Sequence, residues 1–129
     1  MTTFTRYAIY YTPANSPFAQ FGASWLGWDA VTGKPCGLPD VGPLPIALTE
    51  INKRPRKYGF HATLKPPFPL AEGVSEDDLR QATEDLSRQF NKVSLKGLQL
   101  SRMGRTLALM PTGHLEDLTH MASELVQKL

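Results

Sequence analysis

The segment Tyr58–Lys65 places an imidazole, a hydroxyl and an ammonium group at alternate positions. Its apolar residues are Phe60, Ala62 and Leu64, and the polar residues between and after them are His61, Thr63 and Lys65. This alternation predicts a half-buried β-strand, whose successive side chains point to opposite faces of a sheet. We expect the apolar set to be buried beneath helices and the polar set to lie on the open face. That face would combine a group that transfers protons with groups that bind an anionic oxygen.

The residues on either side of this segment should limit the strand. Gly59 gives the backbone room to twist or to approach another group closely. Pro66, Pro67 and Pro69 lack an N–H group to donate to a ladder, so we expect regular pairing to end near Lys65. A strand whose polar residues only face water would show the same alternation. The pattern alone therefore leaves a structural and a catalytic interpretation open.

The sequence around the histidine resembles a known catalytic motif. His61-Ala62-Thr63-Leu64 is similar to the His-x-Thr-hydrophobic motif of the two-histidine phosphoesterase superfamily, which includes RNA ligase-like cyclic phosphodiesterases. The string Arg56–Leu70 resembles an uncharacterised branch of that superfamily, assigned to phosphonate metabolism and often encoded beside genes for phosphonate utilisation. Other segments similar to this branch are Arg6–Tyr11, Phe21-Gly22, Trp25–Gly27 and Leu107–Leu109. The resemblance covers most of the chain, and residues 31–55 are its least similar part.

The resemblance implies a protein of two pseudo-symmetric lobes, each of which contributes one His-x-Thr/Ser motif to a shared cleft. This chain has three histidines, and neither His114 nor His120 is followed two positions later by Thr or Ser. Members of the branch are close to twice as long as this chain. We therefore expect the chain to correspond to the N-terminal lobe only, either as part of a longer product or as a naturally shortened one.

For the complete enzyme, the resemblance implies metal-independent hydrolysis or opening of a phosphodiester, often a cyclic one. One histidine would take a proton from the attacking hydroxyl or water, and the other would protonate the leaving oxygen. The Thr or Ser hydroxyls would bind the non-bridging phosphate oxygens. His61 and Thr63 would be the catalytic residues of this lobe, and an imidazole, which titrates near neutral pH, suits either proton role. The candidates for substrate binding are Tyr58, Lys65, Arg56 and Arg102.

A second hypothesis is a module without catalysis, which holds a phosphorylated or nucleotide-like ligand or serves as an assembly partner. The absence of a second His-x-Thr/Ser motif from these residues favours it. A homodimer that pairs two His61 faces would restore two histidines, as would a missing second lobe. A second motif in adjoining sequence would favour the enzyme. In either case the expected ligand is a small phosphorylated or nucleotide-like molecule.

The composition excludes several other partners. A net charge of +2 over 129 residues is too small for an extended nucleic-acid-binding surface. No apolar run approaches the roughly 20 residues that span a bilayer, so we expect no membrane partner. Met1–Arg6 lacks the basic-then-apolar order of a signal peptide. Cys36 has no partner for an intrachain disulfide, so we expect a cytoplasmic protein.

We expect no metal or other cofactor. His114 and His120 would point about 120° apart on a helix, which prevents them from sharing a metal ion. The chain has no His-Glu-x-x-His motif, no cysteine pair, and no glycine-rich phosphate-binding loop before a helix. Cys36 lies in a loop rich in glycine and proline, without a helix N-terminus to activate its thiol.

The order of the expected elements indicates one α+β domain over residues 1–129, with an antiparallel or mixed sheet and helices packed on one face. These elements are a strand at 7–12, a helix opened by Ser16-Pro17 and stopped by Gly27, the strand at 58–65, a helix opened by Ser75–Asp78, strands at 93–102 and 105–111, and a last helix from about residue 114. Residues 31–55 are rich in proline and glycine and predict a long loop, with one helical turn near 46–51. A loop of this length is a candidate lid.

Three apolar patterns predict the core. The first helix should bury Phe18, Phe21 and Trp25, and the last helix should bury a stripe that includes Leu118 and Leu125. The second helix should bury Leu79, Ala82, Leu86 and Phe90. Residues 107–110 are apolar at every position, which is typical of a strand covered on both faces.

Overall fold

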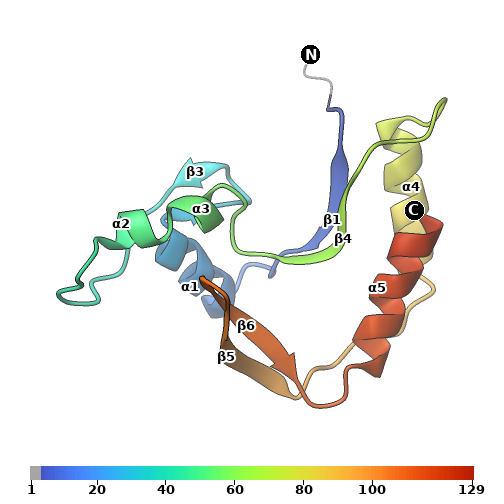
Figure 1. Cartoon of the computed structure of the whole chain (residues 1–129). Helices are drawn as coiled ribbons and strands as arrows, with labels where there is room; N and C mark the ends of the chain where they lie inside the picture. Colours follow the sequence, from blue (N-terminus) through green and yellow to red (C-terminus); the bar gives the residue numbers. More distant parts are fainter. Residues whose placement is uncertain (1–3) are drawn as a thin grey trace. The chain divides into compact units, whose positions relative to one another are not determined.

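The computed structural model describes residues 4–129 and has the expected α+β architecture (Figure 1). Its strands are β1 (Tyr7–Tyr11), β2 (Trp28–Asp29), β3 (Lys34–Pro35), β4 (Ala62–Phe68), β5 (Gly97–Met103) and β6 (Thr106–Thr112). Its helices are α1 (Pro17–Leu26), α2 (Leu48–Ile51), α3 (Lys53–Arg56), α4 (Glu76–Ser87) and α5 (Glu116–Lys128). Met1–Thr3, part of the segment considered above for a signal peptide, lie outside the described residues.

The described strands form three two-stranded sheets, β1–β4, β2–β3 and β5–β6, in place of the single sheet that the sequence suggested. The chain also divides into two compact units. One holds the chain up to Ile9 together with Leu64–Leu129, and the other holds Tyr10–Thr63. β1 and β4 each contribute residues to both units. Within the described part of the chain, no helix combines the length and the apolar character needed to cross a membrane.

In the unit Tyr10–Thr63, α1 begins and ends at the predicted residues. The Ser16 hydroxyl accepts a hydrogen bond from the Ala19 N–H at 3.2 Å, and Pro17 occupies the first turn. The helix ends at Gly27, whose φ of 71° lies in the left-handed region that favours glycine. Both predicted boundaries of this helix are confirmed.

The predicted core face of α1 is only partly correct. Leu26 and Gly22 are buried, but Phe18 and Phe21 are 38% and 54% exposed. Phe21 stacks on Trp25 with ring centroids 6.3 Å apart, so these two aromatic rings cover each other at the surface of the helix. The buried stripe of α1 is therefore narrower than the aromatic pattern predicted.

Residues 31–55, predicted to form a long loop, contain more regular secondary structure than expected. β2 and β3 form an antiparallel pair, and Asp29 closes its turn by accepting from the N–H groups of Val31 and Thr32 at 2.9 and 3.3 Å. The predicted turn of helix near 46–51 is confirmed as α2, and the basic run Lys53–Arg56 forms α3. A side chain from this region caps α1, because buried Asn52 donates to the carbonyl of Trp25.

In the other unit, the capping box predicted at the start of α4 is confirmed. The Ser75 hydroxyl accepts from the Asp78 N–H at 3.1 Å, and the Asp78 carboxylate accepts from the Ser75 N–H at 2.9 Å. Leu86 is buried as predicted, whereas Ala82 is exposed. α5 buries Leu125 and begins at Glu116, so that His114 lies before the helix.

The hairpin predicted near the C-terminus is confirmed as β5–β6, with Gly104 at a φ of 60° in its turn (Figure 1). The predicted burial of residues 107–110 is wrong. Leu107, Leu109 and Met110 are 65%, 37% and 39% exposed. The physical reason is that β5 and β6 pair only with each other among the described strands, so no further strand of their sheet extends over this apolar sequence.

The capping box should make stability depend on acid pH. The hydrogen bond from the Ser75 backbone N–H, supported by the Ser75 hydroxyl, lowers the pKa of Asp78 below its usual value. A carboxyl group with a lowered folded pKa stabilises the fold above its unfolded pKa, and this contribution is lost as the pH falls through the folded value. We therefore expect Asp78→Asn to flatten the acid side of the stability curve. Thermal unfolding, followed by circular dichroism from acid to neutral pH, measures this.

Asp77→Asn is the matched control, because Asp77 lies in the same helical turn outside the capping box. On the acid side, the dependence of stability on pH should be closer to that of the natural chain in Asp77→Asn than in Asp78→Asn. Equal slopes for Asp78→Asn and the natural chain would contradict the assignment.

Candidate functional site

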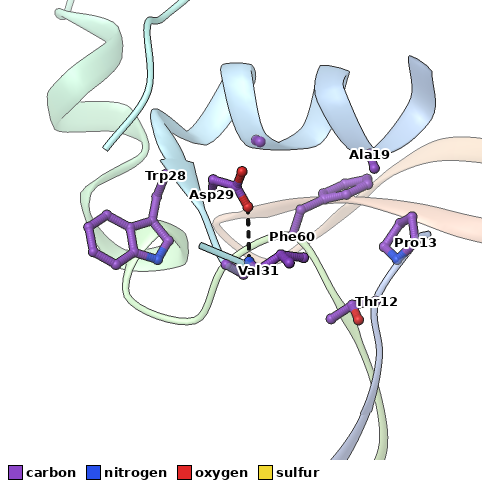
Figure 2. Close-up of a pocket in the computed structure, with 9 residues that line it drawn as sticks. Thr12, Pro13, Ala19, Trp28, Asp29, Val31 and Phe60 are labelled. Carbon is purple, nitrogen blue, oxygen red and sulfur yellow. Dashed lines mark hydrogen bonds between the residues drawn. The ribbon is translucent and has the colours of Figure 1, made fainter. Parts of the chain in front are cut away.

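Phe60 attaches the candidate catalytic segment to α1. Its ring meets Phe18 edge to face, with centroids 5.1 Å apart and an angle of 78° between the rings. A Cβ atom built on Gly22 would lie 2.1 Å from the Phe60 ring, so only glycine leaves room for this ring on the helix. Figure 2 shows the ring directed toward Ala19 of α1. The aromatic side chain thus holds the backbone directly before His61.

The cavity beside Phe60 is too small to hold the expected substrate. It has a volume of about 40 Å³, and Ala19, Trp28 and Val31 are among its lining residues (Figure 2). A space of this size accommodates a few water molecules. His61 is not among its lining residues, so this cavity is not a candidate site for a ligand of His61.

Gly59 bends the backbone in front of the histidine. Its φ of 77° lies in the left-handed region, and a Cβ atom here would lie 2.6 Å from the Cβ of Ala30. The predicted need for backbone freedom and close approach at Gly59 is confirmed. The bend also carries the Gly59 carbonyl back toward the His61 ring.

Both ring nitrogens of His61 have a neighbour within hydrogen-bonding distance. Nδ1 donates to the carbonyl oxygen of Gly59 at 2.9 Å, and Nε2 lies 3.2 Å from Oγ1 of Thr63. The imidazole is half-buried and Thr63 is exposed. The structure therefore brings together the two residues for which the sequence predicted catalytic roles.

Two tyrosines lie beside the imidazole. Tyr10 stacks on it with centroids 4.0 Å apart and an interplanar angle of 22°, while Tyr58 lies at 6.3 Å and is tilted by 40°. Tyr58 is 59% exposed, so it remains a candidate for contact with a ligand. Tyr10 was missed by the sequence analysis. The aromatic strand Tyr7–Tyr11 was visible in the sequence, but its pairing with β4 was not.

The alternation predicted for the strand is not fully realised. β4 begins at Ala62, so His61 lies just before the strand, and it continues through Pro66 to Phe68. Prolines are tolerated here because each strand of a two-stranded sheet has a free edge. Ala62, predicted to be buried, is exposed.

Lys65, predicted on an open face, is buried at 9% exposure. Its ammonium donates to the carbonyl of Val126 at 3.1 Å and lies 4.1 Å from the centre of the Phe68 ring. The carbonyl belongs to the last turn of α5, where backbone acceptors lack partners within the helix. Burial of Lys65 thus has a structural cause in its own unit.

The two predicted arginines also bind backbone carbonyls. Arg56 donates through Nε to Leu26 at 2.9 Å and through Nη2 to Thr49 at 2.8 Å, which joins α3 to α1 and α2. Arg102 donates to the carbonyl of Gly104 at 2.9 Å within the β5–β6 turn. Of the six predicted site residues, the structure gathers Tyr58, His61 and Thr63, and gives the other three these separate contacts.

Two observations concern cofactors and thiol chemistry. Across residues 4–129, no three His, Cys, Asp or Glu side chains form a group that could hold a metal ion. Cys36 is partly buried, and its thiol donates to the carbonyl of Ala23 at 3.1 Å. This contact gives Cys36 a structural role at the side of α1.

Comparison with known sequences gives a family and two long relatives. The model of a family described as "Protein of unknown function (DUF1045)" matches residues 63–129, just over half of the chain. A protein of Janthinobacterium sp. (strain Marseille), named ribose 1,5-bisphosphate phosphokinase PhnN, is 36% identical over 124 residues, which are 95% of this chain and 27% of that protein. A protein of the same name from Laribacter hongkongensis (strain HLHK9) is 34% identical over 119 residues, 92% of this chain and 28% of the relative. The chain thus spans about a quarter of the length of these curated relatives, and no solved structure gives a significant match.

The contact between Phe60 and α1 can be tested through Gly22. Replacing an interior helical glycine by alanine normally stabilises a helix by about 1 kcal/mol. Here the added methyl group would collide with the Phe60 ring, and overpacking of this kind costs about 1–3 kcal/mol. We expect Gly22→Ala to lower the free energy of unfolding measured in urea. In a Phe60→Ala background the same substitution should instead raise it, and equal destabilisation in both backgrounds would contradict the proposed contact.

The structural role of Lys65 predicts the effect of Lys65→Met. Methionine keeps an unbranched side chain over Phe68 but cannot donate to Val126. Loss of a hydrogen bond from a charged group should lower the free energy of unfolding by about 1.5–3 kcal/mol. Denaturant unfolding measures the change, with exposed Lys92→Met as the control. Equal stability of the two variants would show that the contact with Val126 contributes nothing.

Proposed function

The chain belongs to the DUF1045 family of proteins of unknown function, and from this premise we propose that it provides one acid–base centre for phosphodiester hydrolysis in phosphonate metabolism. The observation that carries the proposal is the distance of 3.2 Å between His61 Nε2 and Thr63 Oγ1. A proton carrier and a hydroxyl donor at this spacing can act on neighbouring oxygens of one phosphate group. The resemblance of residues 56–70 to two-histidine phosphoesterases supports the same chemistry.

In the proposed reaction, water attacks the phosphorus atom and loses a proton as the new P–O bond forms. The bond to the leaving oxygen breaks, and that oxygen takes up a proton. His61 performs one of these transfers, while the Thr63 hydroxyl donates to a non-bridging oxygen, on which negative charge increases in the transition state. The second transfer requires another acid–base group, which a second lobe or a second copy of this chain would supply.

The exposed positive charge that precedes His61 in the sequence supports an anionic substrate. Lys53, Arg54 and Lys57 are exposed, and none of them takes part in the ion pairs found among the described residues. They belong to the same unit as His61 and precede it by a few residues. Uncompensated cations at such a position attract phosphate groups through long-range electrostatics.

The substrate class that we propose is a phosphodiester of a small phosphorylated sugar. The two long relatives are named for a phosphokinase that acts on ribose 1,5-bisphosphate, a sugar that carries two phosphates. This chain has no Gly-x-x-x-x-Gly-Lys-Ser/Thr loop of the kind that cradles nucleotide phosphates, so we do not attach the kinase activity to it. From the name of these relatives, we carry over to the proposal only the recognition of a phosphorylated pentose.

Substitution at His61 and Thr63 tests this function with a cyclic phosphodiester of ribose as the substrate. We expect His61→Ala to reduce the rate of hydrolysis by about 10²–10⁴-fold, because it removes the proton carrier. Thr63→Val should reduce it by about 10²-fold, and Thr63→Ser, which keeps the hydroxyl, should retain most of the activity. Chromatographic separation of the product measures the rate.

His114→Ala is the matched control, because His114 is exposed and lies outside the His61 segment. It should retain the activity of the natural chain. Full activity of His61→Ala would overturn the proposal. Binding of ribose 5-phosphate at Tyr58–Thr63, seen by NMR without any hydrolysis, would support a non-catalytic binding module instead.

A further inference from the structure

The hydrogen bonds of His61 determine which of its nitrogens carries the proton. A backbone carbonyl can only accept, so the contact of 2.9 Å between Nδ1 and Gly59 places a hydrogen on Nδ1. A neutral imidazole has a hydrogen on only one of its two ring nitrogens, and Nε2 therefore carries a lone pair. The Thr63 hydroxyl, 3.2 Å away, can donate to that lone pair. The contact with Gly59 thus sets the tautomer, and the contact with Thr63 is compatible with it.

The position of the Gly59 carbonyl depends on the absence of a side chain at residue 59. The φ of Gly59 is 77°, which is in the left-handed region, and a Cβ atom added there would lie 2.6 Å from the Cβ of Ala30. Both features exclude a larger residue at this position unless the backbone rearranges. Ala30 is held in turn by the Asp29 carboxylate, which closes the β2–β3 turn by accepting from the Val31 N–H (Figure 2). The turn therefore supports the backbone that orients His61.

Tyr10 restricts the ring in a second way. Its ring stacks on the imidazole at 4.0 Å and 22°, which is a nearly parallel contact across one face. Rotation of the imidazole out of its present plane, which would carry Nδ1 away from the Gly59 carbonyl, would disrupt this stack. Tyr58, at 6.3 Å and 40°, does not provide an equivalent contact.

We infer that Gly59 and Tyr10 are positioning residues that hold His61 in the Nδ1–H tautomer, so that Nε2 is the nitrogen that accepts a proton and His61 acts as the general base. The assignment of the base rests on the proposed function, whereas the tautomer stands on the geometry alone. During the attack, a proton passes from water to Nε2, while Nδ1–H continues to donate its hydrogen bond to the Gly59 carbonyl. The Thr63 hydroxyl, which no longer has a lone pair on Nε2 to bind, is then free to donate to a phosphate oxygen.

Nitrogen NMR of the full chain tests the tautomer directly. Long-range ¹H–¹⁵N correlation spectra distinguish a protonated ring nitrogen from one with a lone pair. The substitutions His114→Gln and His120→Gln together leave His61 as the only histidine of the chain. At a pH where the ring is neutral, we expect a protonated Nδ1 and an unprotonated Nε2. A protonated Nε2, or averaging between the two forms, would overturn the inference.

Substitution of Tyr10 separates positioning from general stability. Tyr10→Phe keeps the stacked ring and should preserve the Nδ1–H signal, whereas Tyr10→Leu should give a mixture of tautomers and at least a tenfold lower kcat with little change in KM. Tyr58→Leu is the matched control and should keep the single tautomer. A single tautomer in Tyr10→Leu would contradict the role of Tyr10. Gly59→Ala should also give a mixture of His61 tautomers. If this variant does not fold, the spectrum of the chain with Gly59 decides the inference.

The outcomes for the tautomer and for the proposed function are independent. An Nδ1–H tautomer without hydrolysis of the cyclic phosphodiester would leave the positioning assignment in place and remove the proposed enzyme activity. Hydrolysis that depends on His61, in a chain whose Nε2 is protonated, would preserve the function and assign His61 as the general acid instead of the base.

Discussion

The contact between the Phe60 ring and the α1 backbone at Gly22 is the constraint on which the candidate site depends. It fixes the chain at the residue before His61, while the left-handed Gly59 sets the direction in which the backbone arrives. The ring of His61 can then reach both a carbonyl two residues back and a hydroxyl two residues ahead. A larger residue at position 22 would displace Phe60 and so change the geometry of the imidazole. The site is thus built on a close contact between a helix and a single aromatic side chain.

A second feature of the molecule is the use of long polar side chains to satisfy helix ends. The carbonyls of Trp25 and Leu26 at the end of α1 accept from Asn52 and Arg56, and that of Val126 near the end of α5 accepts from Lys65. The last carbonyls of a helix have no partners within it, and the helix dipole makes them favourable neighbours for a cation. This explains the contacts that Arg56 and Lys65, two cations predicted to bind substrate, make with helix ends. The exposed cations Lys53, Arg54 and Lys57 remain available for an anionic ligand.

The arrangement around His61 favours a reaction in which the protein supplies oriented donors and acceptors. One imidazole nitrogen contacts a backbone carbonyl and the other contacts a hydroxyl, and this arrangement is compatible with the proton transfer proposed above. The exposed Tyr58 and the uncompensated cations lie in the same unit of the chain. A binding module would share the last two features, whereas the proposed proton transfer also uses the orientation of the ring.

The sequence by itself determined the parts of this protein whose interactions span only a few residues. The Ser16 cap and Gly27 stop of α1, the capping box of α4 and the turn at Gly104 were all predictable, because each is closed by hydrogen bonds or backbone angles within one turn. The pairing of His61 with Thr63 was predictable as two residue types at a fixed spacing. Tyr10, by contrast, lies far from His61 in sequence, as do Leu26 from Arg56 and Val126 from Lys65, and only the tertiary structure could bring them together. Tertiary structure likewise decided the exposure of residues 107–110. An apolar run indicates that its side chains tend to be buried, but whether they are buried depends on whether another element covers them.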